Sequence, residues 1–143
     1  MVLCLFLINK YLPVADNKGT IYAIGKDKEQ TQCVMQLFFK TETVPDSMKN
    51  SVEYYIQDYV VNMITSMLDA RFTEMSTDPN CSFAYAGAGY GSMFGITKTK
   101  DALTFMGLAK GTDIKPVLEA VYREALRAQR GGFTVTEYAR ARS

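Results

Sequence analysis

The stretch SVEYYIQDYVVNMITSMLDARFTEM, residues 51–75, carries the strongest periodic signal in the chain. Its apolar residues recur at spacings of three and four, which places them on one face of an α-helix. We expect Asp46 or Ser47, just after Pro45, to cap a helix of about 28 residues, or roughly 42 Å at the usual rise per residue. A stripe of methionines and aromatic rings at this spacing is more typical of a core than of a binding groove. The stripe consists of Met48, Val52, Tyr55, Ile56, Tyr59, Val60, Met63, Ile64, Met67, Leu68, Phe72 and Met75.

Extended segments are expected on both sides of this helix. TIYAIG (20–25) alternates like a short strand after the turn residues DNKG, and TQCVMQLFFK (31–40) indicates a second strand. After the helix, residues 82–99 have the pattern of two strands with a bulge or turn near Gly91, and residues 101–110 have that of a further strand. The helix is therefore expected to lie between strands of one sheet.

Two more helices are expected near the end of the sequence. Thr112 or Asp113 would cap the first of them, which ends at the glycine pair 131–132. Thr134 and Glu137 have the spacing of a capping box and start the second. Arg71 and Glu74, three residues apart on the long helix, predict a local ion pair.

The order β-β-α-β-β-β-α-α predicts the fold class α+β. We expect a two-layer sandwich, with a mainly antiparallel sheet and helices on one face. A chain of 143 residues fits one domain. We assign residues 1–18 to an N-terminal extension or linker and 19–143 to a single domain. Because the last helix has barely two turns, we expect this domain to be part of a longer polypeptide.

Composition excludes several classes of function. The net charge is +1, which favours neither nucleic acid nor an acidic membrane as a partner, and the apolar run at residues 2–8 is too short to cross a bilayer. The sequence has no histidine, which excludes Ser-His-Asp and Cys-His catalysis. The three widely spaced cysteines form no CxxC pair. We therefore expect no catalytic residue, metal ligand or cofactor in this chain.

The glycine-rich stretch SFAYAGAGYGSMFG, residues 82–95, does not match a phosphate-binding loop, because it lacks both GxxxxGK[ST] and a helix that follows GxGxxG. Its period-two pattern predicts a strand with Phe83 and Tyr85 on the face of the glycines, and the alanines on the other. Side chains this small allow a helix to pack closely, or leave an exposed strand to which a peptide adds as a further strand. The candidate substrate-binding residues are Tyr85, Ala86, Gly87, Ala88, Gly89, Tyr90 and Gly91.

Three segments together resemble the non-catalytic domain of pitrilysin/insulinase-type zinc metallopeptidases, the inverted zincins. They are MITSMLDARFTEM (63–75), FAYAGAGYGSMFGITKTK (83–100) and VLEAVYREALRAQRGGFTVTEYARARS (117–143). The most specific element is the closing GFTVTEYARAR, and Arg71-Phe72 matches the end of the family's preceding helix. The resemblance extends over about residues 19–143.

This resemblance implies a half-domain like that of the mitochondrial processing peptidase, repeated along a long polypeptide whose halves enclose a peptide chamber. Catalysis and zinc would belong to another domain, which carries the HxxEH motif that this chain lacks. The implied partners are the catalytic and C-terminal domains of the same polypeptide and a peptide or unfolded protein substrate. In insulin-degrading relatives the corresponding domain binds substrate backbone at a strand near small residues, which matches Tyr85 to Gly91.

Two alternatives stay open at the level of sequence. The domain could serve as a structural or partner domain in a peptidase homologue without activity. Without the resemblance, the same pattern fits a small α+β ligand-binding or dimerisation module. The compartment is also open between the bacterial cell envelope or periplasm and the cytoplasm.

Overall fold

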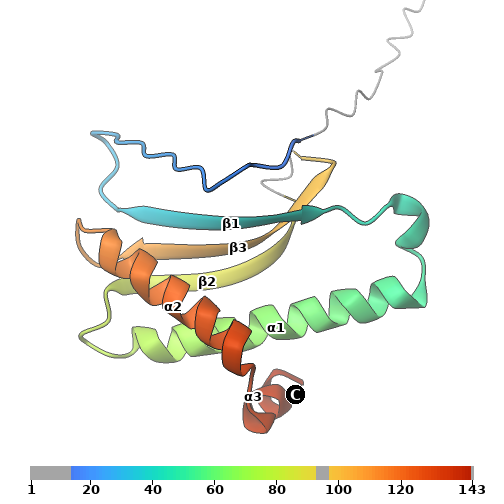
Figure 1. Ribbon diagram of the computed structural model, residues 1–143. Coiled ribbons are helices and arrows are strands. Elements are labelled where there is room, and N and C mark those ends of the chain that lie inside the picture. Colours follow the sequence, from blue (N-terminus) through green and yellow to red (C-terminus); the bar gives the residue numbers. More distant parts are fainter. Residues whose placement is uncertain (1–13, 93–96, 143) are drawn as a thin grey trace, which may run out of the picture.

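Three antiparallel strands form the sheet around which the other elements are arranged (Figure 1). In the computed structural model, which describes residues 14–92 and 97–142, the strand order is β1-β3-β2. The strands are β1 (Val34–Glu42), β2 (Phe83–Ser92) and β3 (Lys100–Ala109). The central strand β3 pairs with both neighbours along nearly its whole length. The predicted α+β class with an antiparallel sheet is confirmed.

The helices complete a second layer beside this sheet. They are α1 (Val52–Ser76), which follows the 3₁₀ turn η1 (Asp46–Met48), α2 (Lys115–Gly131) and α3 (Val135–Arg142). Figure 1 shows α1 running along β2, α2 crossing the sheet, and α3 packed near α1 at the end of the chain. No helix among the described residues is long and apolar enough to span a membrane.

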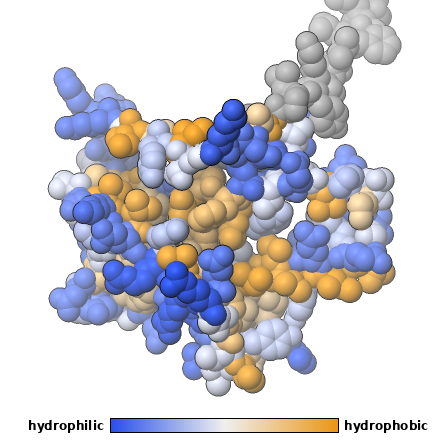
Figure 2. Space-filling model, viewed as in Figure 1, coloured by the Kyte–Doolittle hydropathy of each residue, from blue (hydrophilic) through white to orange (hydrophobic). Residues whose placement is uncertain are grey.

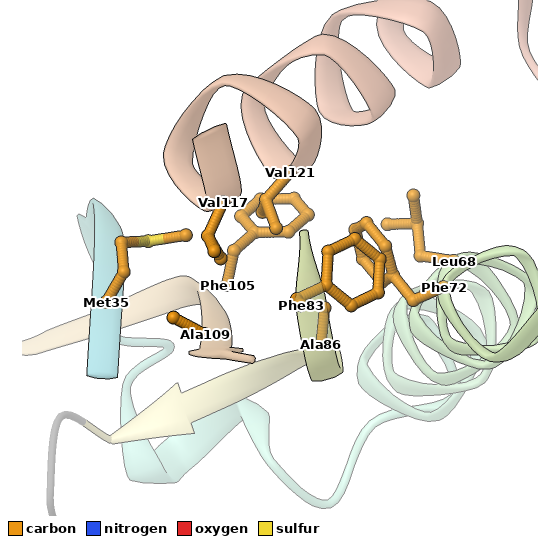
Figure 3. Packing of buried hydrophobic residues seen from close by; sticks show 9 residues of the cluster. All are labelled: Met35, Leu68, Phe72, Phe83, Ala86, Phe105, Ala109, Val117 and Val121. Carbon is orange, nitrogen blue, oxygen red and sulfur yellow. The ribbon is translucent and has the colours of Figure 1, made fainter. Parts of the chain in front are cut away.

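The hydrophobic core lies where α1 and α2 meet one face of the sheet (Figure 3). The ring of Phe72 on α1 packs edge-on against Phe83 of β2 and Phe105 of β3, with centroids 6.2 and 6.3 Å apart. From α2, Val117 packs onto Gly107, where a Cβ atom would come within 2.6 Å of the valine methyl. Gly107 thus allows α2 to approach the sheet closely.

The start of α1 differs from the prediction. Ser51, not Asp46 or Ser47, is the N-cap, and its hydroxyl accepts the Tyr54 N–H at 3.2 Å. Ser51 has the extended backbone that a cap requires, whereas Asp46 begins the separate turn η1. The helix is accordingly 25 residues long.

Two of the predicted strands are not strands in the described residues. Residues 20–25 lie beside β1 in Figure 1 but belong to no strand, and Ile21, Tyr22 and Ile24 are largely exposed. Alternation alone cannot make a strand, because the backbone groups also need a neighbouring strand. The second strand predicted within 82–99 is absent from 97–99, and residues 93–96 lie outside the described residues, as does the apolar run 2–8. The other predicted strands correspond to β1, β2 and β3 with shifted ends.

Candidate functional site

The glycine-rich strand β2 contains a bulge that changes which residues share a face. Phe83 pairs with Ala109 and Tyr85 with Leu108, so Ala84 is an extra residue between them. The predicted face that combined Phe83 with Tyr85 is therefore wrong. Phe83 lies instead on the core face with Ala86, and both are buried.

Ala86 and Ala88 of β2 face the helices, whereas Ala84 in the bulge is exposed. Ala86 is part of the core cluster together with Leu68 and Phe72 of α1, and Ala88 packs against that cluster. Side chains of this size let the helix lie close to the strand. Close helix packing, one of the two interpretations of the small residues, therefore describes this face of β2.

The outer edge of β2 is partly covered by α1. The Asp69 carboxylate accepts the Ala88 N–H at 2.7 Å, so this backbone group is already hydrogen-bonded. Since N–H groups on one edge of an antiparallel strand come from alternate residues, those of Ala86 and Tyr90 also point away from β3. An added strand would have to bind beyond Ala88, toward Tyr90.

The glycines of β2 lie on the opposite face of the sheet from the core. A Cβ atom at Gly87 would come within 2.7 Å of the Tyr85 hydroxyl, so the tyrosine lies over this glycine. Cβ atoms at Gly89 and Gly91 would meet nothing within 4 Å. Gly91 has φ +150°, a conformation that other residues rarely adopt. The second half of this face is therefore bare and accessible.

A cleft of roughly 640 Å³ adjoins the end of β2. It lies between the last residues of β2, the first half of α1 and the segment that joins β1 to α1. The Tyr90 hydroxyl is 3.0 Å from that of Thr41, and the buried hydroxyl of Thr43 has no partner among the described residues. The cleft is lined by Thr43, Val44, Asp46, Lys49, Tyr54, Gln57, Asp58, Val61, Tyr90, Gly91, Ser92, Thr97, Lys98 and Asp101.

Seen together, the candidate residues divide into three groups. Ala86 and Ala88 support the strand from the core side, and Tyr85 covers Gly87. Tyr90 and Gly91 line the cleft. The groups available there are backbone amides, phenols and hydroxyls, which suit hydrogen bonding to a peptide. Among residues 14–92 and 97–142, no group of three or more histidine, cysteine or acidic side chains is placed to hold a metal ion.

A second polar site ties the three helices together through Arg71. Its guanidinium donates to Glu137 at 2.5 Å, to Glu124 at 2.8 Å and to the Gly132 carbonyl at 3.0 Å. It also lies over the Phe133 ring, 4.6 Å from the centroid. The predicted pair of Arg71 with Glu74 is thus wrong. The sequence does contain a sign of the true partner. Glu124 follows Val117 and Val121 at helical spacing, which places this carboxylate on the buried face of α2.

The predicted capping box at the start of α3 is confirmed. The Glu137 N–H donates to the Thr134 hydroxyl at 3.2 Å, and the Glu137 carboxylate accepts the Thr134 N–H at 2.6 Å. The Arg71 hydrogen bond, together with the Thr134 N–H, lowers the pKa of Glu137 from 4.5 to about 2. Glu137 therefore joins the cap of α3 to the side of α1.

Comparison with known proteins shows a likeness of fold alone. No protein-family model and no curated protein matches the chain. Among solved structures, the chain is similar to the periplasmic protease PqqL from Escherichia coli, with a TM-score of 0.67 and 17% identity over 80% of this chain and 12% of that one. A structure of the first half of PqqL gives a TM-score of 0.63 and 18% identity over 78% of this chain and 23% of that one. The chain thus spans about an eighth of PqqL and shares the fold of that part.

Proposed function

We propose that the chain is a non-catalytic domain of a zinc-dependent endopeptidase of the pitrilysin/insulinase type, where it forms part of a wall that encloses a peptide. The observation that carries this proposal is the bare end of β2 at the cleft, in a fold shared with part of a periplasmic protease. Zinc and the catalytic residues would reside in another domain of the same polypeptide. The catalytic and C-terminal domains of that polypeptide would be its partners.

Within this function, the end of β2 would bind the backbone of an extended peptide. The backbone N–H of Ala88 already donates to Asp69. The next backbone N–H on this edge is that of Tyr90, which lies at the cleft. Gly89 and Gly91 carry no side chain that would obstruct the approaching peptide. A peptide that adds as a strand is bound through main-chain hydrogen bonds, so its side chains can vary. This suits a domain that would enclose peptides of many different sequences.

The direct test is an NMR titration of the labelled chain with unstructured synthetic peptides of about ten residues. We expect amide shifts at Gly89 to Ser92, and at least tenfold weaker binding by Gly89→Val, because its branched side chain would stand where the peptide approaches. Gly111→Val is the matched control, since Gly111 also has open space around it but lies in the loop before α2. Unchanged amide signals at Tyr90 and Gly91 under saturating peptide would exclude this binding site.

The alternative is a partner domain in an inactive peptidase homologue, which would have the same fold and the same strand and cleft. The two are separated by the sequence of the complete polypeptide, because the active form requires an HxxEH motif in another domain. Zinc content of the purified complete protein provides a second readout.

A further inference from the structure

The first half of α1 carries an exposed apolar surface, which we call the α1 stripe. Figure 2 shows it as a hydrophobic band along that part of the helix. Its side chains are 46–70% exposed: Val52, Tyr55, Ile56, Tyr59 and Val60. Met48 and Ile64, at either end of it, are also exposed. The cleft beside β2 is lined by other apolar residues of the helix, and Asp58 lies at the border between the two surfaces.

The α1 stripe is large for a free surface. With half of each large side chain exposed, its apolar area is on the order of 600 Å². That is the upper end of the range for the largest patch on a monomer, and it approaches the ~800 Å² that one partner contributes to a standard interface. Its residues follow spacings of three and four, which is the pattern that a second helix recognises.

The stripe continues an interface between helices that already exists in the chain. The helix α3 packs on α1 between Tyr59, which lies beside Tyr138, and Arg71, which binds Glu137. Within this stretch Met63 and Met67 are buried, at 8% and 6% exposure. The same face of α1 thus has a helical partner from Tyr59 onward, and before it Val52, Tyr55 and Ile56 are uncovered.

Charge indicates the chemistry of the missing partner. From Ser51 to Ala70 the helix contains no lysine or arginine, and the charged residues of its first half are Glu53 and Asp58. Lys49, at the start of the stripe, is already paired with Asp46, and Arg142 lies near Tyr59 at its other end. Two copies of the stripe packed on each other would bring four carboxylates together between these ends, and the same carboxylates would repel an anionic lipid surface. A helix with an apolar face and basic flanks would instead be attracted.

We propose that the α1 stripe is the docking surface for an amphipathic helix with basic flanks, presented by a neighbouring protein domain. The partner helix packs along α1 from Met48 to Val60, in line with α3, and inserts apolar side chains between the tyrosines. Its lysines or arginines pair with Glu53 and Asp58. The proposal is independent of peptide binding at β2.

The test uses the whole chain and two synthetic helical peptides with the same leucine stripe, one flanked by lysine and one by glutamate. By fluorescence anisotropy we expect the lysine peptide to bind at least tenfold more tightly at low ionic strength, and this ratio to shrink in high salt. Ile56→Ser should weaken its binding at least tenfold. Ile24→Ser, at another exposed isoleucine, is the matched control and should leave binding unchanged.

Equal affinity for both peptides, or an unaffected Ile56→Ser variant, would overturn the proposal. So would a dimer of the chain, detected by analytical ultracentrifugation, that Ile56→Ser dissociates, since the occupant would then be a second copy. Binding to phosphatidylcholine–phosphatidylserine vesicles that Ile56→Ser abolishes would assign the stripe to lipid instead. The variant Gly89→Val separates this test from that of the proposed function. It changes only the strand site, so it should leave binding of the lysine peptide unchanged.

Discussion

The two halves of α1 have the same apolar periodicity and opposite surroundings. In the second half, Leu68 and Phe72 are almost completely buried against β2, β3 and the other helices. In the first half, Val52, Tyr55 and Ile56 remain more than half exposed. An apolar stripe at helical spacing therefore shows only that a helix face can be buried. Whether it is buried depends on which other elements lie beside it.

The difference follows from where the other helices cross. Both α2 and α3 approach the second half of α1, and Arg71 joins all three through Glu124 and Glu137. Beside the first half lie the end of β2 and the cleft, and α3 reaches it only at Tyr59. One half is therefore part of the core, and the other presents its apolar residues to solvent.

The largest expected effect comes from Phe72→Ala in the buried half. Phe72 has no exposed surface and contacts two other aromatic rings, so truncation leaves a cavity at the centre of the core. We expect the free energy of unfolding to fall by about 3–5 kcal/mol. Urea denaturation followed by circular dichroism measures it. A loss below about 1 kcal/mol would contradict the view that this half of α1 organises the core.

A smaller effect is expected from pH, through the contact that holds α3 on the buried half. The pKa of Glu137 is lowered to about 2, so its contribution to stability is fully present above pH 4.5 and is lost as the pH falls from 4.5 toward 2. Glu137→Gln should reduce stability at pH 7 and flatten its decline over this range. Urea denaturation at pH 7 and pH 3 measures both.

Glu119→Gln is the control for that experiment, because Glu119 is exposed and makes a long contact of 3.8 Å with Lys115. It should leave the pH dependence of the free energy of unfolding as it is in the unmodified chain. An identical acid slope for Glu137→Gln and the unmodified chain would show that Arg71 does not stabilise the ionised carboxylate.

The smallest effect is expected from Tyr55→Ser in the exposed half. Tyr55 is 64% exposed, so its removal should change the free energy of unfolding by no more than about 0.5 kcal/mol. The same urea titration that detects Phe72→Ala provides the measurement. A loss similar to that of Phe72→Ala would mean that the two halves are not energetically distinct.

Near the candidate site, the sequence predicted the individual strands and helices better than the contacts between them. Strand β2 and the capping box of α3 followed from local spacing, because both depend on residues within a few positions of one another. The bulge at Ala84 could not be predicted, since it depends on pairing with β3. The contact of Asp69 with Ala88 and the partners of Arg71 join segments far apart in sequence, which periodicity does not report.

By itself, the sequence determined a long amphipathic helix, a strand with reduced side chains, and the antiparallel α+β class that joins them. These follow from backbone periodicity and local capping, which act over a few residues. Only the tertiary structure decided that Ala86 and Ala88 face α1 and that Phe83 shares their face, because the one extra residue at Ala84 exchanges the faces of the strand. It also decided which half of α1 is core, because burial depends on neighbours that the helix itself does not encode.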